Sequence, residues 1–267
     1  MTPEAREPLA RYLLTIADDE LVLGYRDSEW TGVAPIVEED VAFSSLAQDE
    51  IGHARLLYTL AAELTATDPD QLALRRPKGD YYHARLLEFR ATPKYDPSGQ
   101  HQAGGDWAKA IVRRYLYDLF DDLRTEIIAE SSYPPLAAAI QKVRREERYH
   151  LRHDEAWWHA LAGGPAEGRE RLERAIAALW PDALGLFEPA PGEERLVAEG
   201  ILPLTTAELR LRWVERVAPA FARHGIPLPD ERAAPAVGGR RGEHGPGWDE
   251  LYDEMTMVRR LEPDGAW

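Results

Sequence analysis

Cysteine is absent from the 267-residue chain, which excludes disulfides, thiolate metal sites and cysteine nucleophiles. A basic excess is absent too, because 32 lysines and arginines stand against 47 acids and give a formal charge of −15. This field repels phosphate backbones and anionic lipid, so we expect neither nucleic acid nor a membrane as a partner. No apolar run approaches membrane-spanning length, and MTPEAREPLARYLL lacks the pattern of a signal peptide. We therefore expect a cytoplasmic protein.

Period-two alternation is missing as well, and no hairpin dipeptide separates two apolar runs, which argues against a sheet. Apolar residues instead recur at steps of three and four. The pattern predicts helices over 3–26, 37–64, 106–130, 136–161, 166–187, 192–199, 205–223 and 248–261. The breaker-rich segments RDSEWTGVAP and SSYPP divide the four long N-terminal helices into two pairs, the second by its two prolines.

The predicted fold is all-α, in a single domain over 1–267. A four-helix bundle spans about 3–162, and a helical extension and tail span about 163–267. The segment ATPKYDPSGQHQAGG is expected to be irregular, and IPLPDERAAPAVGGRRGEHGPG an extended tail or loop. Two basic stretches, RRPK at 75–78 and Arg240–Arg241, are interpreted as solvated loops rather than phosphate sites.

Two polar pairs interrupt apolar helix faces. The stretch QDEIGHARLL places Glu50 and His53 in the apolar stripe of the second helix, and Glu147 and His150 do the same in the fourth. These are the only Glu-x-x-His spacings in the chain. Chance predicts roughly one such spacing, and a lone pair of this kind is usually a satisfied buried polar contact. The alternative is a pair of metal-ligand motifs.

The position of the acids favours the metal interpretation. Glu20 and Glu50 are centred on the first turn, and Asp118 and Glu147 on the second. Each lies about 15 residues from its turn, or roughly 22 Å along a helix. Antiparallel helices therefore place all four carboxylates at one depth. One carboxylate on each of two helices, with Glu-x-x-His on the other two, is the ligand set of a carboxylate-bridged dinuclear metal site.

The residue types suit iron or manganese, because four carboxylates and two imidazoles offer oxygen and nitrogen donors and balance two divalent cations. The predicted ligands are Glu20, Glu50, His53, Asp118, Glu147 and His150. Asp49 and Glu146, which precede the two bridging glutamates, are expected to accept the other ring N–H of a ligating histidine. Gly52 is expected to allow close helix packing. Inward-facing alternatives to Asp118 are Asp121, Asp122 and Glu126.

Four motifs carry a family resemblance across essentially the whole chain. DDELVLGYRDSEWTG, LAQDEIGHARLLYTLAAEL, EERYHLRHDEAWWHAL and VGGRRGEHGPGWDELYDEM resemble the C-type subunits of the phenylacetyl-CoA 1,2-epoxidase complex, a bacterial di-iron multicomponent monooxygenase. The tail motif is specific to that subunit type. The part up to about residue 162 is also similar to the catalytic A-type subunits.

The resemblance implies a ferritin-like bundle in a hetero-oligomer with the A-type subunit. Such a complex epoxidises the ring of phenylacetyl-CoA in aerobic phenylacetate degradation. It uses O2 and reducing equivalents that a separate iron–sulfur flavoprotein delivers from NADPH. C-type subunits are regarded as structural partners, and many have lost metal ligands. Here the A-type di-iron set falls on the six predicted ligands with nothing missing.

Three functions follow from these observations. The leading hypothesis is the structural partner of the A-type subunit. The second is an oxygenase or oxidase with its own working di-iron centre. The third is a storage or oxidase bundle unrelated to acyl-CoA, against which the long C-terminal extension speaks. A homodimer of the chain by itself is left open.

Overall fold

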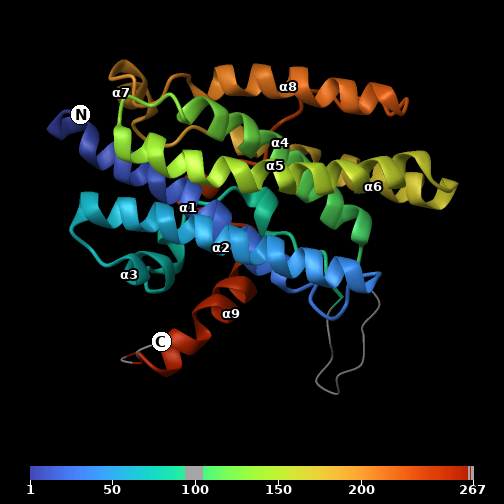
Figure 1. Cartoon of the computed structure of the whole chain (residues 1–267), viewed down its shortest axis with the longest axis horizontal. Coiled ribbons are helices and arrows are strands. Elements are labelled where there is room, and N and C mark those ends of the chain that lie inside the picture. The colour runs from blue at the N-terminus through green and yellow to red at the C-terminus, as the bar shows by residue number, and fades with distance from the viewer. Residues whose placement is uncertain (94–104, 264, 266–267) are drawn as a thin grey trace.

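The structure is a computed structural model that describes residues 1–93, 105–263 and 265. Every regular element within these ranges is helical (Figure 1), which confirms the all-α prediction. The four long N-terminal helices are α1 (Arg6–Ser28), α2 (Val37–Thr65), α4 (Trp107–Ile128) and α5 (Pro134–Gly163). Most of the segment expected to be irregular at 91–105 lies outside the described residues.

The long helices form two antiparallel pairs, α1 with α2 and α4 with α5, and α2 also packs on α5 (Figure 1). The prolines of SSYPP begin α5 rather than standing outside it, because a helix leaves its first N–H groups unpaired in any case. Gly24 allows the close packing of α1 on α2, since a Cβ there would lie 2.9 Å from Ile51 Cγ1. The expectation for Gly52 is wrong, because a Cβ there would meet nothing within 4 Å.

Further helices and single turns link and extend the pairs. They are η1 (Pro3–Ala5), α3 (Pro69–Leu74), η2 (Lys78–Asp80), η3 (Arg85–Glu88), α6 (Ala166–Leu184), η4 (Gly185–Phe187), α7 (Glu193–Ala198), α8 (Thr206–Arg223), η5 (Gly239–Arg241) and α9 (Trp248–Leu261). Helix α6 packs on α4 and α5, α8 packs on α4, and α9 contacts α3 on the other side of the molecule (Figure 1). Within the described ranges, no helix has the length and apolar character needed to cross a bilayer.

The two basic stretches are not simply solvated loops. Arg240 is 4% exposed and forms a buried ion pair with Asp19 of α1. Arg76 pairs with Asp18, which is also fully buried. The basic composition of these stretches predicted solvent-exposed arginines. The two acids buried on α1 require cationic partners, however, and the fold brings these arginines to them from distant segments.

Candidate metal centre

Three long helices bring five of the predicted ligands together in the interior. Glu20 comes from α1, Glu50 and His53 from α2, and Glu147 and His150 from α5, and each is at most 4% exposed. Ligand atoms of the first four all lie within 4.8 Å of one another, a spacing that suits a metal ion.

The two carboxylates of the Glu-x-x-His motifs lie between the two imidazoles. His53 Nδ1 is 3.0 Å from Glu147 Oε1 and 3.6 Å from Glu50 Oε2. His150 Nδ1 is 3.3 Å from Glu50 Oε1 and 3.6 Å from Glu147 Oε1. The ring centroids are 6.0 Å apart. Glu50 and Glu147 thus face both histidines, which is the position that bridging carboxylates take in a dinuclear site.

The opposite ring nitrogen of each histidine meets an acid from the facing helix. His53 Nε2 lies 2.7 Å from Glu146 Oε2, and His150 Nε2 lies 3.2 Å from Asp49 Oδ2. A carboxylate on Nε2 favours the tautomer that carries its proton there, which leaves Nδ1 free as a donor to a cation.

Asp118 is inward-facing and fully buried, but it stands apart from the close four-residue group. Its Oδ2 accepts a hydrogen bond from Arg114 Nη2 at 3.0 Å, while its Oδ1 has no hydrogen-bond partner among the described residues. Asp121 is buried too, and accepts from Arg124 Nε at 2.8 Å. Asp122 and Glu126 instead pair with Arg216 of α8, on the outside of the helix pairs.

Two buried arginines of α4 belong to the site and were not predicted. Arg114 forms ion pairs with Asp27, Asp118 and Asp154, and its Nη1 lies 3.4 Å from Glu50 Oε1. Arg124 Nη2 donates to Glu20 Oε1 at 3.1 Å. Their spacing from Asp118 and Asp121 was a readable signal, because residues three or four apart on a helix are neighbours.

These contacts shift the pKa values of the site strongly. Burial, together with Asp121 and Glu50, raises the pKa of Glu20 well above its ordinary value. Burial lowers the pKa of His53, but the carboxylates of Glu147, Glu20 and Glu50 outweigh burial and raise it far above the imidazole range. The metal-free site therefore retains protons that a cation would displace.

The buried charged groups in and around the site carry more negative than positive charge. Among the described residues, close contacts between charged groups and histidines connect nine buried carboxylates to four buried guanidiniums, which leaves a charge of −5 when all nine are ionised and the histidines neutral. The carboxylates are those of Asp19, Glu20, Asp27, Glu39, Glu50, Asp118, Asp121, Glu147 and Asp154, and the guanidiniums those of Arg113, Arg114, Arg124 and Arg240. Two divalent cations would cancel most of this charge.

Buried polar atoms that make no hydrogen bond show that the residues fit such cations. Within the described part of the chain, seven buried atoms of the six predicted ligands make no hydrogen bond: Glu20 Oε2, Glu50 Oε2, His53 Nδ1, Asp118 Oδ1, both carboxylate oxygens of Glu147, and His150 Nδ1. Buried polar groups are rarely left unpaired, and oxygen and imidazole donors suit iron or manganese.

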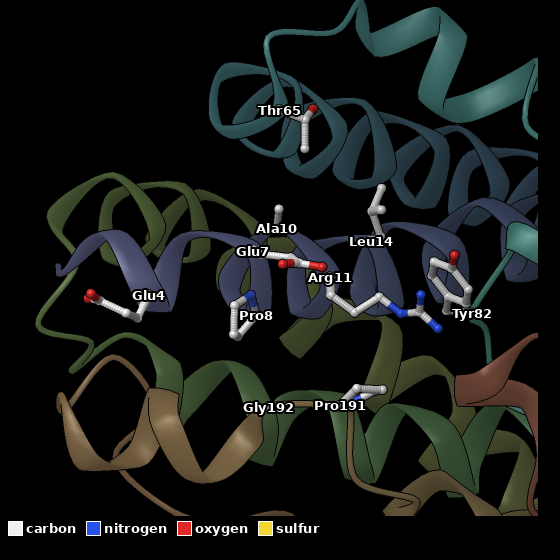
Figure 2. Close-up of a pocket in the computed structure, with 10 residues that line it drawn as sticks. All are labelled: Glu4, Glu7, Pro8, Ala10, Arg11, Leu14, Thr65, Tyr82, Pro191 and Gly192. Atoms are coloured by element: carbon white, nitrogen blue, oxygen red, sulfur yellow. The ribbon is translucent and has the colours of Figure 1, made fainter.

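The pocket in Figure 2 is separate from this cluster. Its volume is about 490 Å³, and it lies between α1, the end of α2 and the Pro191–Gly192 turn. Arg11 extends over the ring of Tyr82 at its rim, with Cζ 3.0 Å from the ring centroid. None of the six predicted ligands lines it.

Comparison with known proteins confirms the resemblance carried by the motifs. A family model described as "Phenylacetic acid catabolic protein" matches residues 1–267. The C-type subunit of the 1,2-phenylacetyl-CoA epoxidase of Escherichia coli (strain K12) is 31% identical over 260 residues, which cover 97% of this chain and 99% of that protein. The A-type subunit of the same organism's epoxidase is 28% identical over 233 residues, which cover 85% of this chain and 71% of that protein. The chain therefore belongs to the phenylacetic acid catabolic protein family.

Proposed function

We propose that this chain is a component of a phenylacetyl-CoA epoxidase complex and acts mainly as the structural partner of the catalytic A-type subunit. The observation that carries this proposal is the similarity to the C-type subunit of the Escherichia coli epoxidase, which extends over nearly the full length of both proteins. The weaker and partial similarity to the A-type subunit fits a paired, related chain. Electrons from NADPH would reach the complex through a separate reductase.

The helix pairs are proposed to be a ferritin-like bundle that carries a dinuclear iron site. Glu20, Glu50, His53 and Glu147 would hold one ion, and Asp118 and His150 would join the two bridging glutamates around the other. Bound iron would supply redox chemistry with O2. The donor set and its unpaired atoms support this assignment.

Neighbouring side chains orient these ligands by hydrogen bonds and shield them from water. Tyr117 Oη and Arg124 Nη2 both donate to Glu20 Oε1, at 2.9 and 3.1 Å, so only Oε2 of that carboxylate is free. Arg114 holds Asp118 through one oxygen in the same way. The ligand side chains are nearly inaccessible to water. Such burial suits a protected site in a structural partner better than one open to a large acyl-CoA.

Co-purification tests the partner role. Tagged chain and an A-type subunit from the same organism are co-expressed, and the mixture is separated by size-exclusion chromatography at micromolar concentration. We expect one co-eluting species, and phenylacetyl-CoA epoxidation only when both chains and a reductase are present. An unrelated ferritin, as a control, should elute separately. Elution of the two chains as separate species would contradict the proposal.

The second candidate function is an oxidase or oxygenase activity of this chain itself, which the complete ligand set favours. Anaerobic loading with Fe2+ followed by iron analysis tests it. We expect more than about one iron per chain in the parent and a large loss in Glu50→Ala, because bridging carboxylates contribute to both ions. Equal iron content in parent and variant would count against a metal centre. Iron without O2 consumption in the isolated chain would count against the activity alone.

A further inference from the structure

We infer that Arg240, in the C-terminal tail, is a positioning residue of the metal centre and acts on Glu20 through Asp19 and Arg124. The inference rests on the proposed metal centre and assigns a role to the tail motif VGGRRGEHGPGW. It concerns how the protein orients one ligand, whereas the proposed function concerns which ligands are present.

Arg240 reaches from the tail into the interior of the bundle. Its Nη1 lies 2.7 Å from Asp19 Oδ1 and its Nη2 lies 2.9 Å from Asp19 Oδ2, a two-pronged pairing of guanidinium with carboxylate. Nη1 also donates to the carbonyl oxygens of Thr15 and Tyr82. A lysine has no planar fork and would not reproduce this geometry.

Asp19 shares its charge between two guanidiniums. Besides Arg240, its Oδ2 accepts a hydrogen bond from Arg124 Nη1 at 3.0 Å, and its Oδ1 accepts from the Ala84 N–H at 2.8 Å. The Asp19 carboxylate therefore links the tail to α4 through its contacts with Arg240 and Arg124.

Arg124 carries this link to the metal centre. Its Nη1 binds Asp19, while its Nη2 donates to Glu20 Oε1. The other oxygen, Glu20 Oε2, lies 3.8 Å from His53 Nδ1 and makes no hydrogen bond among the described residues. Loss of the Arg240 guanidinium would leave Asp19 with one cation. Arg124 would then be drawn toward Asp19, and Glu20 would keep only Tyr117 of the two donors that fix its free oxygen toward the other ligands.

The turn at residues 238–242 of the tail is also held by Glu188, and this contact provides a matched control variant for the test. The N–H groups of Gly238 and Arg240 both donate to Glu188 Oε2, and the Arg241 guanidinium pairs with Glu188. Gly238 has a φ of 118° and Gly242 a φ of 80°, a conformation that favours glycine. Arg241 thus holds the same turn as Arg240, but its side chain is half exposed and does not reach Asp19.

The test compares Co2+ binding by Arg240→Gln, Arg240→Lys and Arg241→Gln in the full chain. Anaerobic calorimetry gives the affinity, and visible absorption of bound Co2+ reports ligand geometry. We expect Arg240→Gln to weaken Co2+ binding by about tenfold and to change the spectrum, as losses of hydrogen-bond partners of metal ligands do. Arg240→Lys should weaken binding less and still alter the spectrum. Arg241→Gln should match the parent in both.

A double variant shows whether the effect passes through Arg124. Arg240→Gln should add little to the loss caused by Arg124→Gln, because both break one connected path. Full additivity, or equal effects of Arg240→Gln and Arg241→Gln, would overturn the inference. If Arg240→Gln fails to fold, Arg240→Lys serves as the test instead. Co2+ binding by Arg240→Lys that equals that of the parent would then overturn the inference. A parent chain that takes up no Co2+ would instead overturn the metal centre itself.

Discussion

His53 Nε2 lies 2.7 Å from Glu146 Oε2, so a buried imidazole on α2 is held by an acid that reaches in from the surface of α5. Asp49 of α2 takes the same position toward His150 of α5. Each Glu-x-x-His motif therefore supplies a histidine to the interior, and the acid directly before it meets the histidine of the other motif. The acid that meets each buried imidazole is itself solvent-exposed.

Glu146→Gln should therefore weaken metal binding by about tenfold, because an amide is a poorer acceptor for the ring N–H and no longer favours the Nδ1 lone pair. Co2+ titration by calorimetry measures the change. Glu63→Gln, which removes an exposed acid elsewhere on α2, is the charge-matched control and should behave like the parent. Equal affinities in Glu146→Gln and Glu63→Gln would show that the carboxylate does not support the histidine.

Metal removal should lower stability, since a cation that binds only the folded state adds to the free energy of unfolding. Co2+ at about 100 times its dissociation constant should raise that free energy by about 2.7 kcal/mol over chelator-treated protein. Glu50→Ala should abolish the increase, whereas Glu38→Ala, at an exposed position of the same helix, should retain it. Urea unfolding with and without Co2+ measures both. An increase that survives in Glu50→Ala would place the ion elsewhere.

Arg114→Met should be severely destabilising, by about 3–5 kcal/mol, because it leaves buried carboxylates without their shared cation. These are Asp27, Asp118 and Asp154. Arg216→Met removes a guanidinium from the partly exposed pairs with Asp122 and Glu126, and should cost about 1 kcal/mol or less. Urea denaturation of metal-free protein compares them. Similar losses in both variants would mean that Arg114 is not the main counter-charge of the centre.

Low pH should weaken the attachment of the C-terminal tail, because protonation of Glu88 weakens its contacts with His244 and Gly245. His83 and His244 stack at 4.2 Å between ring centroids and both face Glu88 Oε1, at 3.2 and 2.9 Å. Burial raises the pKa of Glu88, but the two histidines outweigh burial and lower it from 4.5 to about 2. Because the folded-state pKa is depressed, the stabilisation is present above the unfolded value and disappears as pH falls from about 4.5 toward 2.

Glu88→Gln should accordingly reduce the free energy of unfolding by about 3 kcal/mol at pH 6, and the difference from the parent should shrink toward pH 3. Urea unfolding at a series of pH values measures this difference. A gap that stays constant over the whole range would assign the loss to packing or neutral hydrogen bonding rather than to the charge of Glu88.

Local pattern determined the helices of this protein. Apolar steps of three and four, with breakers such as SSYPP, place each predicted long helix within a few residues of its observed ends. These signals are readable because a helix is stabilised by residues close in sequence. The constant rise of a helix also places Glu20, Glu50 and Glu147 at one level, so the sequence alone predicts that they meet.

Only the tertiary structure decided how charge is distributed around those ligands. The ion pair with Arg114 decides whether Asp118 can offer one oxygen or two to a metal ion. The position of Arg114 in turn depends on its ion pairs with acids from α1 and α5. Asp19 is satisfied by a tail residue more than 200 positions away. Gly24 rather than Gly52 lies at the helix contact, because the facing side is set by packing. Periodicity reports which residues share a face, but it carries no information on which distant cation will neutralise a buried acid.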